Sequence, residues 1–240
     1  MTCKTIPLAR VCIRLLIPGV LVAAAWSIAA GAAPAGESAA RVQLDQPTTV
    51  PGYLASLLIN ENPFPGERGY ESQQNTQDGM LAILWVLHSR IHYIPPGYTQ
   101  EQVAAIRSRD IIQVITAGGQ KGQCDGFFLD SAGRFVTAPR VQKRIANLVK
   151  IANQSKQPGR FSQLLLFARD LSRAYVKEGI TGADRYAGLT RVQRIEVTGR
   201  AYSWMTDRDC YKPGGNFVSI PDDDDGVLGG NRFFTLKKLK

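Results

Sequence analysis

The chain has 240 residues, 44% of them hydrophobic, and a formal net charge of +9. That hydrophobic content is enough for a packed core and excludes wholesale disorder, and the length suits one ordinary domain or two small ones. The basic residues are scattered, and no segment interleaves arginine with aromatic residues as a base-stacking groove does. We therefore expect no nucleic-acid partner, and attraction to anionic surfaces such as cell-wall polymers.

Residues 1–35 have the order of a secretory signal peptide. Basic residues come first, an apolar run follows from Leu15 to Ala25, and small residues close the segment. The run is shorter than the ~20 residues that a membrane-spanning helix needs. We expect export with cleavage near Ala30 to Ala35, a secreted or periplasmic location, and no stable membrane anchor after cleavage. An uncleaved anchor is the alternative.

The rest of the chain is expected to be a flexible lead-in, residues 36–52, and a single domain, residues 53–240. The lead-in is polar and contains two prolines. A short apolar run from Leu54 to Asn60 then predicts one or two helical turns. The following segment, residues 62–78, has no apolar periodicity and predicts a long loop, and loops of that length inside a compact domain are often functional.

The strongest helix signal covers residues 76–94. Apolar residues recur there at helical spacing, as in Met80, Ile83 and Leu87. A second helix is expected over residues 99–116, since "TQEQ" at its start is a capping-box pattern. The other expected elements are a β-hairpin over residues 124–139, helices over 140–154 and 159–179, and strands over 216–220 and 231–236. This order predicts an α+β fold that is mostly helical, with a small β-hairpin element.

Two cysteines, Cys124 and Cys210, remain once the expected signal peptide is removed. In an oxidising compartment two cysteines most simply form one disulfide bond. We therefore expect a bridge between the middle of the domain and its C-terminal part, with two buried free thiols as the alternative.

The sequence favours neither a metal site nor a cofactor. His88 and His92 have the spacing of two zinc ligands on a helix, but "HSRIH" lacks the glutamate of HExxH. We expect His88 to be partly buried and His92 to lie on the surface. The acidic run at residues 222–225 does not match an EF-hand loop, because no glutamate follows at the twelfth position. A solvated turn is the better interpretation.

A carboxylate is the remaining candidate for chemistry. Glycoside cleavage needs an acid that stays protonated near neutral pH, which requires apolar neighbours. Glu61 follows "LASLLIN" and precedes two prolines and Phe64, so apolar groups can crowd it. Glu67 and Glu71 lie in a charged loop and should be better solvated. An ordinary surface glutamate at a helix end remains the plainer interpretation of Glu61.

Five blocks in the chain resemble, in order, the cell wall hydrolase family typified by the spore cortex-lytic enzymes (SleB-like). The first block ends at Glu61, and the second runs from Gly79 to Arg90. The blocks are "LASLLINE", "GMLAILWVLHSR", "DIIQVITAGGQKGQCDGF", "TGADRYAG" and "VLGGNRFF", which together span residues 54–234.

The resemblance implies a lysozyme-like domain of the lytic transglycosylase superfamily that binds peptidoglycan glycan strands. Such enzymes are lytic transglycosylases or muramidases that cleave the bond between N-acetylmuramic acid and N-acetylglucosamine. Glu61 would be the catalytic acid and then the base, and Tyr186 and Asn231 match positions near the cleft and would contact sugar. Among the aromatic residues, Phe64, Trp85 and Trp204 are further candidates for stacking on sugars.

The chain departs from the family pattern at two places. Glu71 lies eight residues before Gly79, which is the family's usual spacing between glutamate and glycine, so it is a rival to Glu61. Asn231 and Arg232 stand where the family has a histidine. The alternative function is therefore a catalytically inactive cell-wall-binding or envelope assembly protein with the same fold.

Overall fold

The computed structural model describes residues 41–119, 122–154, 157–206, 214–221 and 227–239. The expected signal peptide, the acidic turn and Cys210 lie outside these ranges. Within them the chain is a mixture of helices and small antiparallel sheets, so the expected α+β class is confirmed.

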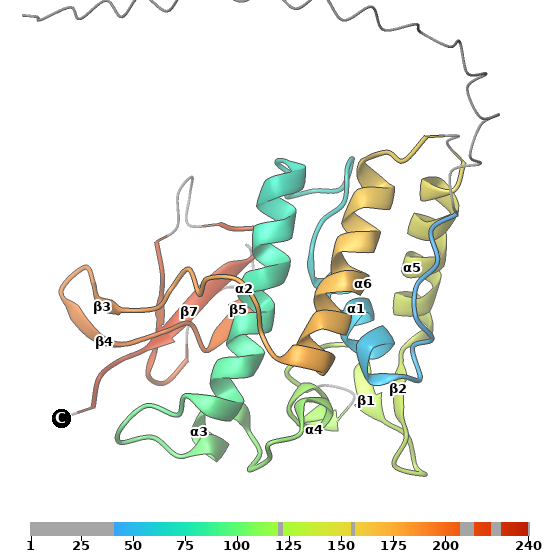
Figure 1. Cartoon of the computed structure of the whole chain (residues 1–240). Helices are drawn as coiled ribbons and strands as arrows, with labels where there is room; N and C mark the ends of the chain where they lie inside the picture. Colours follow the sequence, from blue (N-terminus) through green and yellow to red (C-terminus); the bar gives the residue numbers. More distant parts are fainter. Residues whose placement is uncertain (1–40, 120–121, 155–156, 207–213, 222–226, 240) are drawn as a thin grey trace, which may run out of the picture. The chain divides into compact units, whose positions relative to one another are not determined.

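Most of the helical residues lie in four helices, and α2 lies between the other long helices and the C-terminal strands of residues 189–236 (Figure 1). Helix α6 packs against α1, α2 and α5, whereas α2 also contacts α3, α4 and strand β5. None of the helices in the described ranges is long and apolar enough to cross a bilayer. The helices are α1 (Val50–Glu61), α2 (Gln73–His92), α3 (Gln100–Ala104), α4 (Ile111–Thr116), α5 (Pro139–Ala152) and α6 (Arg160–Glu178).

The strands form three small antiparallel sheets. One is the hairpin β1–β2, another is β3–β4, and the third has the order β5-β7-β6 with β7 in the middle. In this third sheet Trp204 lies opposite Phe233. The strands are β1 (Phe127–Leu129), β2 (Phe135–Thr137), β3 (Leu189–Val192), β4 (Ile195–Gly199), β5 (Ser203–Met205), β6 (Phe217–Ser219) and β7 (Arg232–Leu236).

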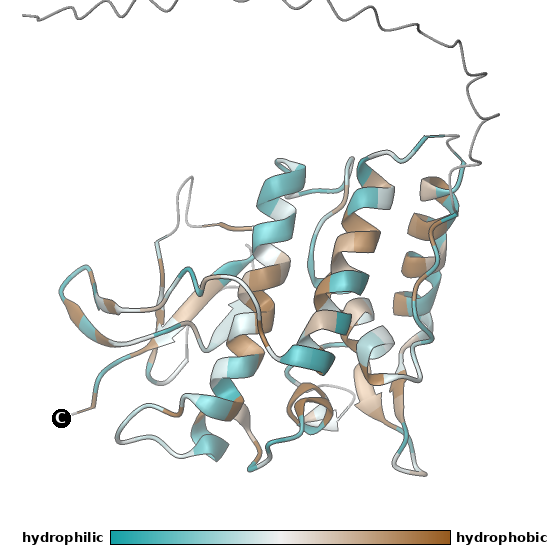
Figure 2. Cartoon of the chain, in the orientation of Figure 1, coloured by the Kyte–Doolittle hydropathy of each residue, from teal (hydrophilic) through white to brown (hydrophobic). Residues whose placement is uncertain are grey.

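One large core joins the helices to the C-terminal sheet. Apolar and polar stretches alternate along α2 and α6 (Figure 2), as expected when one face of a helix is buried. In α2 the residues predicted to form this face, among them Met80, Ile83 and Leu87, are fully buried. The helices expected over residues 76–94, 140–154 and 159–179 are therefore confirmed as α2, α5 and α6.

The described part of the lead-in is anchored to the helices, which differs from the expected flexible segment. The Val42 amide donates to Asn153 Oδ1 at 2.8 Å, and Arg173 forms an ion pair with Asp45. Helix α1 also starts at Val50, four residues earlier than expected, because the Thr49 hydroxyl accepts the amide of Gly52 and so caps the helix.

The single helix expected over residues 99–116 is two helices. The capping box at Thr99 and Gln102 is present, but Ala105 has a left-handed backbone with φ of 59° and ends α3. Asp110 then caps α4 by accepting the amide of Ile112 at 2.8 Å. A polar segment with a strong new N-cap separates the two apolar runs, so one continuous helix was the wrong prediction.

The loop after Glu61 is shorter than expected, and three strands were not predicted. Helix α2 begins at Gln73, with Ser72 as its N-cap. The missed strands are β3, β4 and β5. Burial does not alternate along β3 and β4, and β5 has only 3 residues, which is too short for a period-2 signal. The hairpin over residues 124–139 and the strands β6 and β7 are confirmed.

Cys124 is buried and is not bridged to any residue that the structure describes, and burial raises the pKa of its thiol form to about 12. The bridge to Cys210 stays a prediction. We expect no titratable thiol when protein recovered from an oxidising compartment is unfolded in denaturant without reductant. Two thiols per molecule in that titration, after cleavage of the leader, would show that Cys124 and Cys210 are not joined.

Candidate active site

Glu61 is the last residue of α1 and lines a pocket of about 170 Å³. The helix ends there because Asn62 has an extended backbone and Pro63 follows, and a residue before proline is pushed out of the helical region. Most of the preceding residues of α1 are buried, and Glu61, at the end of the helix, is partly exposed. The pocket is lined by Asn60, Glu61, Asn62, Pro63, Glu67, Arg68, Arg144, Thr206 and Gly230.

The Glu61 carboxyl group has two side-chain hydrogen-bond donors. Trp204 Nε1 donates to Oε2 at 3.0 Å, and Asn60 Nδ2 donates to Oε1 at 3.1 Å. Burial raises the pKa of Glu61, the two donors act in the opposite direction, and the Asp125 carboxylate adds a smaller upward effect. Because burial is the largest of these effects, Glu61 keeps its proton to higher pH than an ordinary glutamate.

The backbone just after Glu61 is positioned by a close approach of two distant segments. Asn231 Nδ2 donates to the Glu61 carbonyl oxygen at 2.9 Å and lies 3.4 Å from Asn62 Oδ1. A Cβ atom on Gly79 would lie 2.5 Å from Asn62 Oδ1 and 2.8 Å from the Gly229 Cα. The contact between α2 and the turn before β7 therefore requires glycine at position 79.

Arg144 of α5 holds the other side of the pocket. Its guanidinium donates to the Ile59 and Asn62 carbonyl oxygens at 2.5 Å and 2.9 Å, and it forms a two-point ion pair with Glu67. Glu67 also accepts the Phe64 amide at 2.8 Å. Arg144 thus satisfies carbonyl groups at the end of α1 and fixes the turn that follows the catalytic candidate.

Replacing Arg144 by methionine should lower the free energy of unfolding by about 1.5–3 kcal/mol, since charged hydrogen bonds to two carbonyls and Glu67 are lost. Chemical denaturation measures this. Arg134→Met is the control: that side chain is 78% exposed in its pair with Asp130, and the expected loss is below about 1 kcal/mol. Equal losses for the two variants would contradict the assigned role of Arg144.

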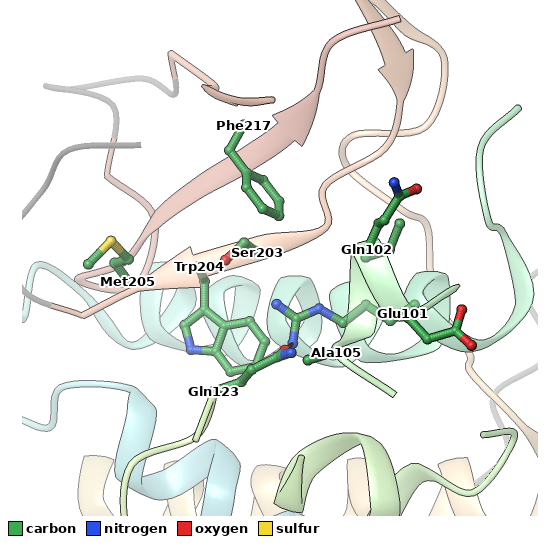
Figure 3. A pocket seen from close by; sticks show the side chains of 10 residues that line it. Glu101, Gln102, Ala105, Gln123, Ser203, Trp204, Met205 and Phe217 are labelled. Carbon is green, nitrogen blue, oxygen red and sulfur yellow. Dashed lines mark hydrogen bonds between the residues drawn. The ribbon is translucent and has the colours of Figure 1, made fainter. Parts of the chain in front are cut away.

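A larger pocket, of about 390 Å³, begins on the other side of Trp204. Trp204 lines this pocket, and its Nε1 bonds Glu61, which lines the smaller pocket, so Trp204 links the two pockets although they share no lining residue. Figure 3 shows Trp204, Ser203 and Met205 of β5 on one side of this pocket and Glu101 and Gln102 of α3 on the other. A third pocket of about 390 Å³ shares two lining residues with it, Gln102 and Phe217.

The expected sugar contacts are not at the surface of these pockets. Phe64 is fully buried, where it packs near Phe161 and Arg144. Tyr186 is buried against Phe233, and Asn231 is buried against the backbone of Glu61. These side chains support the site from inside and cannot touch a ligand in the described arrangement.

Glu71, the rival acid, is exposed and lies just before the N-cap of α2. It does not line the pocket beside Glu61. Glu71 is therefore a solvated side chain, as expected of a residue in the charged loop.

His88 and His92 lie one helical turn apart on α2, at or near its surface. His88 is partly buried, its Nδ1 lies 3.4 Å from the Tyr175 hydroxyl, and His92 is exposed. Burial, with a contribution from His92, lowers the pKa of His88 to about 4, so it is neutral at physiological pH. The described residues contain no group of three or more metal-ligating side chains.

Sequence reasoning missed two functional contacts. Trp204 was considered for sugar stacking, but it is the hydrogen-bond donor to Glu61. Arg144 carried no sequence signal at all, because its α5 helix reads as an ordinary amphipathic helix. A buried tryptophan needs a partner for its indole N–H, and that requirement was the available hint for Trp204.

Comparison of the chain with protein-family models, with curated proteins and with solved structures found no match.

Proposed function

We propose that this protein is an exported peptidoglycan-cleaving enzyme, a lytic transglycosylase or muramidase, with Glu61 as its acid and base. The observation that supports this most is the Glu61 carboxyl group, which lines a pocket and has its pKa raised by burial. A general acid for a glycosidic oxygen needs that combination. The expected signal peptide and the positive charge fit an envelope location and an anionic polymer.

In the proposed reaction the Glu61 carboxyl group donates its proton to the oxygen between N-acetylmuramic acid and N-acetylglucosamine. The bond from that oxygen to the muramic acid C1 breaks, and positive charge develops on the sugar ring. The Glu61 carboxylate then removes a proton from the sugar's own 6-hydroxyl or from water, and this proton restores the acid. The oxygen that lost the proton forms the new bond to C1. One carboxylate is adequate for attack by the 6-hydroxyl, because that group is already held in the substrate.

The contacts between blocks support the proposed lysozyme-like fold. The first block ends at Glu61, the second begins at Gly79, and the last contains Asn231. These three segments, far apart in the chain, meet at the backbone around Asn62. The pocket of Glu61 and the two larger pockets, which share Gln102 and Phe217, would give room for more than one sugar of a polymer.

The test is a zymogram with purified protein on peptidoglycan sacculi, followed by mass spectrometry of the released fragments. We expect clearing and muropeptides with either an anhydro or a reducing end, which distinguishes transglycosylase from muramidase. No clearing at any pH between 4 and 9, with a folded protein, would overturn the enzyme proposal.

A catalytically inactive wall-binding protein is the second candidate. The burial of Phe64, Tyr186 and Asn231 favours it, because none of these three expected sugar contacts is accessible. This candidate predicts that the protein pellets with sacculi without clearing them. Clearing by the purified protein would exclude it.

In the profile of activity against pH, the pH at which activity is lost on the basic side should depend on Trp204. Its N–H bond favours the ionised form of Glu61, so Trp204→Phe should raise the pKa of Glu61 further. Activity requires the protonated acid and is lost as pH rises through that pKa, so the basic limb should move to higher pH. Rates of sacculus clearing from pH 4 to 9 measure this. Trp85→Phe is the control, and a Trp204→Phe limb that stays in place or moves to lower pH would contradict the assignment.

A further inference from the structure

Arg90 lines the 390 Å³ pocket beside Trp204 and is almost completely buried, with 4% of its surface exposed. Nε donates to the Tyr202 carbonyl oxygen at 2.7 Å, and Nη1 donates to Gln123 Oε1. The guanidinium lies over the Trp204 ring, 5.3 Å from its centre. These contacts fix the plane of the guanidinium at the wall of the pocket.

No carboxylate in the described ranges forms an ion pair with Arg90, and the partners it has are neutral. Its remaining N–H donors have no partner among the described residues. Burial lowers the pKa of Arg90 to about 10, so the group is still charged at neutral pH. A buried charge without a counter-charge is costly, and such groups are normally paired.

The one acidic residue lining this pocket does not supply the counter-charge. Glu101 lies on the side remote from Trp204 (Figure 3). Its carboxylate is held by Arg107, with Oε1 lying 3.5 Å from Nε. Both side chains are solvent-exposed, and no ion pair joins Glu101 to Arg90.

We propose that this pocket binds a carboxylate on the substrate, with Arg90 as the residue that recognises it. The inference rests on the proposed function, because it places the carboxylate on a sugar adjoining the one that Glu61 protonates. The substrate class is thus a glycan whose muramic acid carries a free carboxylate on its lactyl arm.

The rest of the pocket suits a carboxylate attached to a short apolar arm. Val103, Met205 and Phe217 supply apolar surface, and Ser203 and Gln102 supply polar groups. The planar fork of an arginine matches two carboxylate oxygens at once. Trp204 joins this pocket to Glu61, so a sugar seated here lies next to the acid.

The test compares N-acetylmuramic acid with its methyl ester, two probes that differ in the carboxylate charge, by calorimetry at pH 7. We expect the acid to bind about tenfold more tightly than the ester, as a charged hydrogen-bonded pair provides. N-acetylglucosamine, which lacks the arm, should bind no better than the ester. Equal affinities for the acid and the ester would overturn the proposal. It would also be overturned if inorganic phosphate competed with N-acetylmuramic acid and bound with the same affinity.

Variants give the second measurement. Arg90→Lys keeps the charge and loses the fork, and Gln123→Ala removes an exposed residue that orients Arg90; both should reduce the preference for the acid at least about threefold. Arg134→Met removes an exposed charge outside this pocket and should leave the preference for the acid unchanged. Circular dichroism verifies the fold, and a preference unaltered in both folded variants would refute the role of Arg90.

Failure of this proposal is distinguishable from failure of the proposed function. The binding measurement is repeated with Glu61→Gln, which does not touch the Arg90 pocket. Preference for the acid in a protein that never clears sacculi would leave the carboxylate site standing and remove the catalytic proposal. Clearing of sacculi by a protein that shows no preference for the acid would keep the catalytic proposal and remove the carboxylate site.

Discussion

Replacing Glu61 by glutamine is expected to reduce the rate of sacculus clearing by about 10²–10⁴-fold, the contribution of a positioned acid–base group. Glutamine has the same shape and its carbonyl oxygen still accepts the Trp204 indole N–H, so the pocket is kept. It has no proton to donate at any accessible pH. Stability should stay the same or rise slightly, because a partly buried carboxyl group is replaced by a neutral amide.

Glu71→Gln is the matched control, since Glu71 is exposed and lies outside the pocket. Its clearing rate should stay within about twofold of the unmodified protein, as expected of surface substitutions away from the site. Clearing that survives Glu61→Gln and disappears in Glu71→Gln would transfer the acid role to Glu71.

Replacing Gly79 by alanine is expected to lower the free energy of unfolding by about 2–3 kcal/mol, the upper part of the usual range for overpacking. The new methyl group would lie 2.8 Å from a backbone atom of Gly229 and 2.5 Å from Asn62 Oδ1. Alanine favours a helix by about 1 kcal/mol over glycine, so the clash must exceed that gain. Thermal unfolding should show a fall of about 2–4 °C for each kcal/mol.

Gly159→Ala is the control for this substitution, because a Cβ atom there would meet nothing within 4 Å. Gly159 is the N-cap of α6, and the expected loss is below about 1 kcal/mol. The Gly79 variant should also clear sacculi more slowly, since Asn62 adjoins Glu61. A Gly79 variant as stable as the Gly159 variant would show that the two segments separate at little cost.

The long helices were predictable because their signals are local. In α2 and α6 the apolar residues recur at the helical period, and Gly179, with φ of 85°, ends α6 where the sequence predicts. Where local signals compete, the prediction failed. Residues 99–116 contain two apolar runs, but the polar segment between them carries the Asp110 cap, which starts a new helix and divides the segment.

The placement of Glu61 at a helix end was also predictable. Pro63 stops the helix whatever the rest of the chain does, because the residue before a proline avoids the helical region. The apolar run before it is buried, as expected of a helix that packs in the core. The sequence by itself therefore determined that a carboxyl group stands where a buried helix breaks.

What surrounds that carboxyl group was decided by the tertiary structure. Trp204 lies 143 residues further along the chain, and Arg144 reaches Ile59 across 85 residues. Such contacts leave no periodic pattern, because they depend on how whole elements pack rather than on neighbouring residues. For the same reason the chain folds Phe64 and Tyr186 into the core, although their residue types alone fit sugar stacking equally well.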